Sequence, residues 1–226
     1  MRLVPTTLAF ATVLLLTSSG ADPARLANPP RSPRFAPPAS GVMLADDFSG
    51  DLHRWQPDRD GVWSLSHGML RGELPDRKQE RSVIYAGLEA WRDYAVDLDA
   101  CMMRGVDKGI VVRAEGNSGI GVDLRGGIYQ DVVMYAGKWP LGKSAVVNAN
   151  GTWNHIRIEA RGSRYTVTVN GELKIVRTDQ RREQGRIALP AYTGGAGQCT
   201  VYYDNVIVTA LGTRDASPGR APEHPE

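Results

Sequence analysis

The sequence predicts an all-β protein: a two-sheet antiparallel β-sandwich around one core. Apolar and polar residues alternate with period two through the middle of the chain, and no long stretch keeps the i, i+3, i+4 spacing of a helix. Turn-forming clusters such as Gly116-Asn117-Ser118 separate the alternating runs at sandwich spacing. Because each run has one apolar face, two sheets must share a core. No repeating unit indicates a propeller or a solenoid.

The clearest pair of strands lies in residues 153–170. Apolar residues alternate with charged ones up to a Gly-Ser pair at 162–163, and the alternation then continues. A two-residue turn that starts on glycine suits a type II′ hairpin and places Ile158 opposite Val167. Further strands are expected at Val62–Leu65, Met69–Leu74, Ser82–Ala86, Tyr94–Met103, Gly109–Ala114, Gly119–Arg125, Arg186–Pro190 and Cys199–Thr209.

The first residues have the three-part layout of a secretory signal. Arg2 precedes an apolar stretch at 8–16, and small residues follow up to Ala21. The apolar stretch is too short to span a bilayer, which takes about 20 apolar residues. We therefore expect export to the outside of the cell, the periplasm or the cell envelope, with no membrane span.

Composition divides the rest of the chain. A signal peptide at 1–21 precedes a proline-rich leader at 22–41, which cannot bury enough apolar surface to fold. One sandwich domain is expected at 42–211, followed by a disordered tail at 212–226. The net charge of +2 implies no nucleic acid partner. We expect a monomer.

Both cysteines, Cys101 and Cys199, follow the signal segment. In an oxidising compartment a pair of cysteines predicts a disulfide. The alternation places Cys101 on the polar face of its strand and Cys199 on the face of Val201, so the bond would need a bulge.

Glycines mark one face of the segment 108–125. If two strands pair there with Arg113 opposite Gly121, the missing side chains leave a trough flanked by Arg113, Asp123 and Arg125. A ligand with many hydroxyl groups could lie on the backbone and bond these charged groups. The alternative is a solvated face with two bulge-forming glycines.

Aromatic residues follow in the segment 126–140. Tyr129, Tyr135 and Trp139 stand among glycines, and rings with apolar faces stack well on sugar rings. Trp139 is the main candidate for such a platform. These aromatics could equally be ordinary core residues.

Carboxyl groups are the candidates for catalysis. Asp97 and Asp99 alternate on one strand face, and Asp123 lies on the glycine-marked face. Cleavage of a glycosidic bond uses two carboxyl groups about 5 to 9.5 Å apart. An exposed acidic face without catalytic function remains the alternative. No Ser-His-Asp arrangement and no zinc-like cluster is visible in the sequence.

The order of several short motifs resembles one known family. They are D-D-F, W-S-L-S-H-G-M-L, D-Y-A-V-D-L-D, K-G-I-V-V-R, W-N-H-I-R-I-E-A-R-G, V-T-V-N-G, G-R-I-A-L and V-Y-Y-D-N-V-I-V-T-A-L. Together they are similar to the 3-keto-disaccharide hydrolase domain family, which shares the concanavalin A-like lectin/glucanase jelly roll. The resemblance implies a curved sheet whose concave side meets sugar, in a family whose characterised members cleave oxidised glycosides. Pro190 and Tyr192 stand where a Gln and a His are often seen, which departs from the enzyme-like pattern.

Two functions follow as hypotheses. The first is a secreted carbohydrate-recognising domain, with Arg113, Gly121, Asp123, Arg125, Tyr129, Trp139 and Tyr192 as ligand contacts. The second is a glycoside hydrolase or lyase acting on 3-keto-glycosides. The fold that the resemblance implies often holds a structural Ca²⁺ ion, for which Asp46, Asp47 and Asp204 are the expected ligands because calcium prefers oxygen donors.

Overall fold

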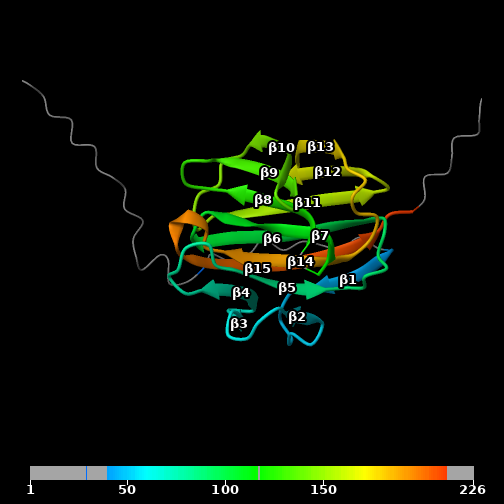
Figure 1. Cartoon of the computed structure of the whole chain (residues 1–226). Coiled ribbons are helices and arrows are strands. Elements are labelled where there is room, and N and C mark those ends of the chain that lie inside the picture. Colours follow the sequence, from blue (N-terminus) through cyan, green and yellow to red (C-terminus); the bar gives the residue numbers. More distant parts are fainter. Residues whose placement is uncertain (1–28, 30–39, 117, 213–226) are drawn as a thin grey trace, which may run out of the picture.

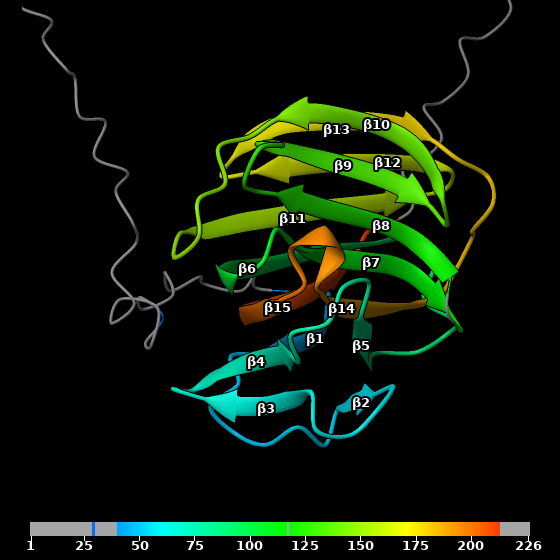
Figure 2. The same cartoon turned by 60° about the vertical axis from the view of Figure 1, so that its left-hand side comes forward.

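The protein is a two-sheet antiparallel β-sandwich, as the alternation predicts. The structure, a computed structural model, describes residue 29 and residues 40–116 and 118–212. Figures 1 and 2 show the two sheets stacked as layers. The expected signal peptide, most of the leader and all but the first residue of the tail lie outside the described residues.

Within the described residues, fifteen strands and one short helical turn follow one another along the chain. They are β1 (Val42–Asp46), β2 (Trp55–Pro57), β3 (Trp63–Ser66), β4 (Met69–Leu74), β5 (Arg81–Ala86), β6 (Tyr94–Arg104), β7 (Asp107–Glu115), β8 (Ser118–Arg125), β9 (Asp131–Ala136), β10 (Trp139–Ala145), β11 (Trp153–Arg161), β12 (Arg164–Val169), β13 (Glu172–Thr178), β14 (Arg186–Tyr192) and β15 (Cys199–Ala210), with the 3₁₀ turn η1 (Gly194–Ala196) before the last strand.

Each sheet interleaves strands from distant parts of the chain. The eight-stranded sheet has the order β13-β12-β11-β6-β15-β4-β3, and β1 also pairs with β15. The seven-stranded sheet has the order β10-β9-β8-β7-β14-β5-β2. In Figure 2, β8 to β10 form a layer in front of β11 to β13. Within the described residues, no helix is long and apolar enough to span a membrane.

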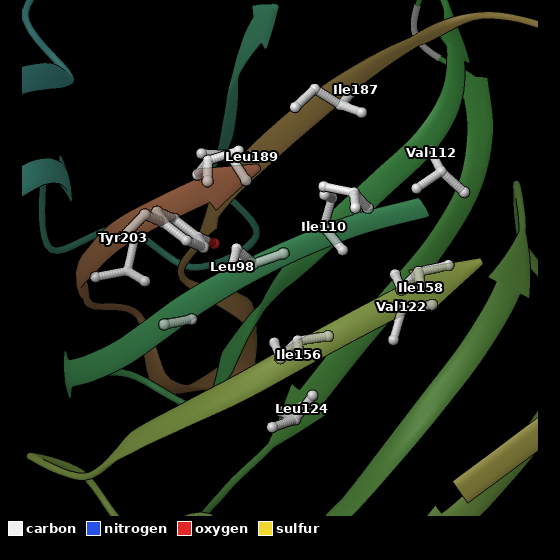
Figure 3. Close-up of a cluster of buried hydrophobic side chains, with 14 of the residues drawn as sticks. Leu98, Ile110, Val112, Val122, Leu124, Ile156, Ile158, Ile187, Leu189 and Tyr203 are labelled. Atoms are coloured by element: carbon white, nitrogen blue, oxygen red, sulfur yellow. The ribbon is translucent and has the colours of Figure 1, made fainter. Parts of the chain in front are cut away.

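The inward faces of both sheets supply the core. Ile156 and Ile158 of β11 point toward Ile110 of β7 and Val122 of β8, and all four are fully buried (Figure 3). These are the apolar positions of the predicted alternation. Period-two patterning therefore placed the core residues correctly.

The β11–β12 hairpin has the predicted register. Ile158 pairs with Val167, and the two-residue turn begins at Gly162 with φ of 50°. A positive φ at this position is the reason that glycine suits the turn.

The β7–β8 pair has a different register from the predicted one. Val111 lies opposite Gly121, and the pairing becomes irregular between Val112 and Glu115. Arg113 stands in this bulge with φ of 50°. An extra residue in one strand turns its side chain away from the expected face, so the prediction that Arg113 lies opposite Gly121 is wrong.

The predicted disulfide is also wrong. Cys101 and Cys199 are free and buried. Cys199 packs in the main core, whereas Cys101 belongs to a separate cluster with Met69 and Tyr202. The two thiols therefore point to opposite faces of the eight-stranded sheet, and no bulge brings them together.

Candidate functional site

An open pocket of about 290 Å³ lies on the outer face of the seven-stranded sheet. Val83, Val111 and Ala188 form its floor, on three neighbouring strands, and they make an apolar cluster separate from the core. Tyr85 and Tyr135 border the floor. The next residues along the same strands face the core, so strand alternation produces both surfaces at once.

Tyr135 lies across Gly121. A Cβ atom at Gly121 would be 2.2 Å from Cζ of Tyr135, so the ring occupies the space that a side chain would take. The predicted trough above Gly121 is therefore filled by a tyrosine of the protein. Gly121 serves the pocket indirectly, because it lets Tyr135 lie flat against the sheet and form a wall.

Two carboxyl groups stand on the same face beside the pocket residues. Asp107 opens β7, and Asp123 of β8 is opposite Gly109, so the two aspartates are diagonal neighbours across the strand pair. A Cβ at Gly109 would be 2.8 Å from Oδ1 of Asp123. The missing side chain at Gly109 therefore leaves room for the Asp123 carboxyl group.

The environment of these carboxyl groups favours their protonated forms. Burial, together with the negative charge of Asp123, raises the pKa of Asp107 to about 7. Oδ1 of Asp107 is buried without a hydrogen-bond partner among the described residues. Burial also raises the pKa of Asp123, although the hydroxyl group of Tyr135 opposes this by donating a hydrogen bond to it. Near neutral pH, one proton shared by such a pair provides an acid beside a base.

Arg125, a predicted ligand contact, is already engaged. Its guanidinium donates two hydrogen bonds to Asp131, of 2.8 and 2.7 Å, and lies 4.4 Å from the ring centroid of Tyr129. Tyr129 remains about half exposed. These residues form a fixed group beyond Asp123 at the end of β8.

Tyr192 and Arg81 complete this end of the face. They lie opposite each other on β14 and β5, and the hydroxyl group of Tyr192 donates to the side chain of Gln79. Burial raises the pKa of Tyr192, and the charge of Asp107 adds to the effect. The structure therefore brings Asp123, Arg125 and Tyr192 of the predicted set to one face, as expected from sequence.

Arg113 is not part of this face. Its side chain is fully buried, and its guanidinium donates to the carbonyl groups of Arg92, Gly162 and Arg182. It also donates to the hydroxyl group of Tyr165 at 3.0 Å. Arg113 ties loops together at one end of the sandwich, and the prediction of a ligand contact at this residue is corrected.

Asp97 and Asp99, the other catalytic candidates, lie on the outer face of the eight-stranded sheet. Both are buried, and His155 bonds them with its two ring nitrogens, at 3.2 Å to Asp97 and 2.9 Å to Asp99. Arg157 also bonds Asp97, and Asn205 bonds Asp99. The hydrogen bonds from His155 to Asp97 and Asp99 raise the pKa of the imidazole to about 9. The group is a hydrogen-bonded ionic cluster on β6 and β11, in the opposite sheet from Asp123.

Trp139 stands at the start of β10 and is 70% exposed, so it is not a core residue. The neighbouring Gly137 lines the pocket. The calcium expectation stays a prediction. Asp46 and Asp47 accept hydrogen bonds from Phe48 and Ser49, and within the described residues no group of three or more His, Cys, Asp or Glu side chains could hold a metal ion.

Comparison with known proteins identifies the family. The sequence profile of the 3-keto-alpha-glucoside-1,2-lyase-like domain matches residues 44–209, which is most of the chain and nearly all of the described part. The chain belongs to this family. An extracellular exo-alpha-L-arabinofuranosidase from Streptomyces chartreusis is 33% identical over 64 residues, 28% of this chain and 8% of that protein. The chain therefore resembles only a small part of that enzyme.

Solved structures give the 3-keto-alpha-glucoside-1,2-lyase-like domain a lectin-like jelly-roll fold. The carbohydrate binding module CBM66 from Bacillus subtilis has a TM-score of 0.60 at 15% identity and covers 71% of this chain and 98% of that chain. The Crh5 transglycosylase has a TM-score of 0.60 at 16% identity, with coverage of 83% and 90%. The exoplasmic/lumenal domain of VIP36 has a TM-score of 0.59 at 11% identity, with coverage of 78% and 91%. At these identities the likeness shows the fold.

Sequence reasoning missed important residues of this lyase-like domain. The strands expected from sequence begin at Ser82 and Gly109, whereas β5 begins at Arg81 and β7 begins at Asp107. Alternation therefore assigned no face to Arg81 or Asp107. Tyr135 was noted, but its strand β9 was not. The signal for β9 was present in D-V-V-M-Y-A, whose alternation begins directly after a turn.

Proposed function

We propose that this domain binds carbohydrate on the outer face of its seven-stranded sheet. The observation that carries the proposal is the pocket, which has an apolar floor of Val83, Val111 and Ala188 and a polar edge that includes Arg81 and Ser118. A sugar ring has the same division, because its C–H groups form an apolar face and its hydroxyl groups form a polar rim. Pockets that bind small molecules combine apolar linings with few polar groups in this way.

Aromatic residues border the pocket. Tyr85 and Tyr135 stand beside its floor, and the apolar face of such a ring can stack on the C–H groups of a sugar. Trp139 is exposed, but it pairs with core-facing Ala136 and so stands on the other face of the sheet from Tyr135. The platform proposed for the glycan is therefore Tyr85 and Tyr135.

The setting of this binding is outside the cytoplasm. The N-terminus has the layout of a secretory signal, and the partial match to an arabinofuranosidase is to a protein described as extracellular. Both observations support a secreted or cell-envelope location.

Binding can be tested by calorimetry of the full chain with a panel of purified glycans. Tyr135→Leu should weaken the affinity about tenfold or more, because loss of an aromatic platform costs about 1 kcal/mol or more. The matched control is Leu173→Ala, an exposed apolar residue on β13 of the other sheet, which should bind as the native protein does. If no glycan binds, or if both variants bind normally, the proposal is wrong.

Cleavage is a second candidate function, favoured by the paired carboxyl groups of Asp107 and Asp123. In a 1,2-elimination on a 3-keto-glucoside, a base takes the proton on C2, which the neighbouring ketone makes acidic. The C–H electrons form a double bond between C1 and C2, the bond from C1 to oxygen breaks, and an acid protonates the departing oxygen. When the pair holds a single proton, Asp107, whose pKa is raised to about 7, suits the acid, and the carboxylate of Asp123 suits the base.

Turnover of 3-keto-glucosides, followed by mass spectrometry, tests this second function. Asp107→Asn should lower the rate at least a hundredfold, since general acid catalysis contributes about 100-fold to 10,000-fold, while substrate affinity changes little. Asp97→Asn, on the opposite sheet, is the matched control and should retain turnover. Binding without product would leave carbohydrate recognition as the function and reject cleavage.

A further inference from the structure

Arg81 places a positive charge in the pocket, where it opposes the rise in the pKa of Asp123. It is the first residue of β5, it lines the pocket, and its side chain is exposed. The guanidinium makes no hydrogen bond and no ion pair with any residue that the structure describes. Nearby arginines differ, because Arg59 and Arg77 both pair with Glu80.

No carboxyl group among the described residues forms an ion pair with Arg81. Asp58 also lines the pocket, but its Oδ1 accepts a hydrogen bond from Ser82, which in turn accepts one from Trp63. Burial raises the pKa of Asp107 to about 7, so this carboxyl group carries only part of its negative charge near neutral pH.

A second arginine adds positive charge at the far end of β14. The guanidinium of Arg186 lies 4.6 Å from the ring centroid of Tyr85 and donates to Gln56 at 2.8 Å. Its Nε is buried without a partner among the described residues. Tyr85 itself is held by a hydrogen bond of 2.9 Å from its hydroxyl group to the carbonyl of Gly116. The ring that borders the pocket is therefore fixed and carries a cation on its side.

We infer that the glycan taken by this pocket is acidic, and that Arg81 binds its carboxylate as found in a uronic acid. This inference rests on the proposed carbohydrate-binding function and specifies its ligand class. In a uronic acid the carboxylate projects from the edge of the ring. A ring lying on the floor of Val83, Val111 and Ala188 therefore directs that group toward the rim, where Arg81 stands. The planar guanidinium matches a carboxylate with two parallel hydrogen bonds.

The experiment compares oligouronates with their methyl esters, which keep the same rings and linkages but lack the charge. Calorimetry with the full chain should show that the acid binds about tenfold more tightly than the ester at low salt, and that the difference shrinks as salt increases. Arg81→Gln should abolish the difference, and Arg81→Lys should keep part of it, because lysine retains the charge but not the fork. Arg164→Gln changes an exposed arginine of β12 and should leave the difference intact.

The outcomes separate this inference from the function on which it rests. Equal binding of acids and esters would overturn the acidic ligand and leave carbohydrate binding in place. A preference for acids that survives Arg81→Gln would overturn the role of Arg81. If neutral and acidic glycans all fail to bind, the proposed function fails together with the inference. Thermal unfolding of each variant shows that it is folded before binding is measured.

Discussion

The outer face of each sheet carries a pair of aspartates, and the two pairs differ in their hydrogen bonding. On the eight-stranded sheet, Asp97 and Asp99 are bonded by His155 and by further polar partners. On the seven-stranded sheet, Asp107 keeps a buried oxygen without a partner among the described residues, and its pKa is raised to about 7. Each face has a pair of aspartates, but only Asp97 and Asp99 are bonded by cationic partners.

This difference distinguishes structural charges from candidate functional ones. A buried charge that is fully hydrogen-bonded holds strands together. A carboxyl group with a raised pKa and an oxygen without a hydrogen-bond partner can instead bind a ligand or exchange a proton. The pocket lies on the face with the uncompensated pair. Five measurements test this comparison.

The largest effect is expected from Asp97→Ala. The change leaves His155 and Arg157 without one of their acceptors at a buried position, so the free energy of unfolding should fall by about 2 to 4 kcal/mol. Urea unfolding monitored by fluorescence measures this loss. Glycan affinity of the folded protein should not change, and a loss of affinity without a loss of stability would reverse the roles of the two faces.

Gly121→Ala should have an intermediate effect on the opposite face. The new Cβ would displace the Tyr135 ring, at a cost of about 1 to 2 kcal/mol in stability and with reduced glycan affinity. Calorimetry and urea unfolding measure both quantities. Gly127→Ala is the control for the loss of a glycine, because Gly127 is not among the pocket-lining residues and nothing lies within 4 Å of its Cβ position, although its φ of 60° carries some strain. Normal binding by Gly121→Ala would show that Tyr135 is not a wall of the site.

The dependence of stability on pH should separate the two acidic groups. The pKa of Asp107 is raised from 3.8 to about 7, so the folded state holds more protons between these values and stability falls as pH rises through that range. Thermal unfolding between pH 4 and pH 8 should show this fall. Asp107→Asn should flatten it by on the order of 1 kcal/mol after solvent screening.

His155 should produce a second fall at higher pH. Its pKa is raised from 6.5 to about 9, so its contribution is complete below pH 6.5 and is lost as pH rises through about 9. His155→Gln should remove the fall in this range and leave the Asp107 range unchanged. A single transition removed by both variants would mean that the two faces are coupled.

A reducing agent should have no effect on stability, which is the smallest effect in this series. Cys101 and Cys199 are free, so dithiothreitol should leave the unfolding midpoint unchanged, and thiol titration of the unfolded chain should find both thiols. A disulfide would instead contribute about 2 to 4 kcal/mol that the reductant removes.

Part of the site could be predicted because strand alternation assigns faces locally. Asp123, Arg125 and Tyr192 were expected on a ligand-facing surface and do lie on one face, and the core positions of β11 and β12 were correct to the register. Each of these assignments needs only the pleat of a single strand. The roles of these residues in ligand binding remain predictions.

The predicted ligand contact at Arg113 and the predicted disulfide were wrong because they depend on more than the pleat of a single strand. A bulge within β7 changes which way Arg113 points, and the faces of Cys101 and Cys199 matter only once β6 and β15 are known to be neighbours. The edge strands β2, β10 and β13 were also missed, since each is short or interrupted by polar residues. Bulges and edges depend on partners that are distant in the sequence.

The sequence by itself determined the fold class, the family and the composition of the core, because period-two patterning and motif order are properties of the chain. Only the tertiary structure decided which acids are compensated and which stand beside a pocket. Asp107 comes from β7, Arg81 from β5 and Tyr135 from β9, and the sheet order brings them to one face. Burial and electrostatic neighbours, which set the pKa of a group, arise only when those strands assemble.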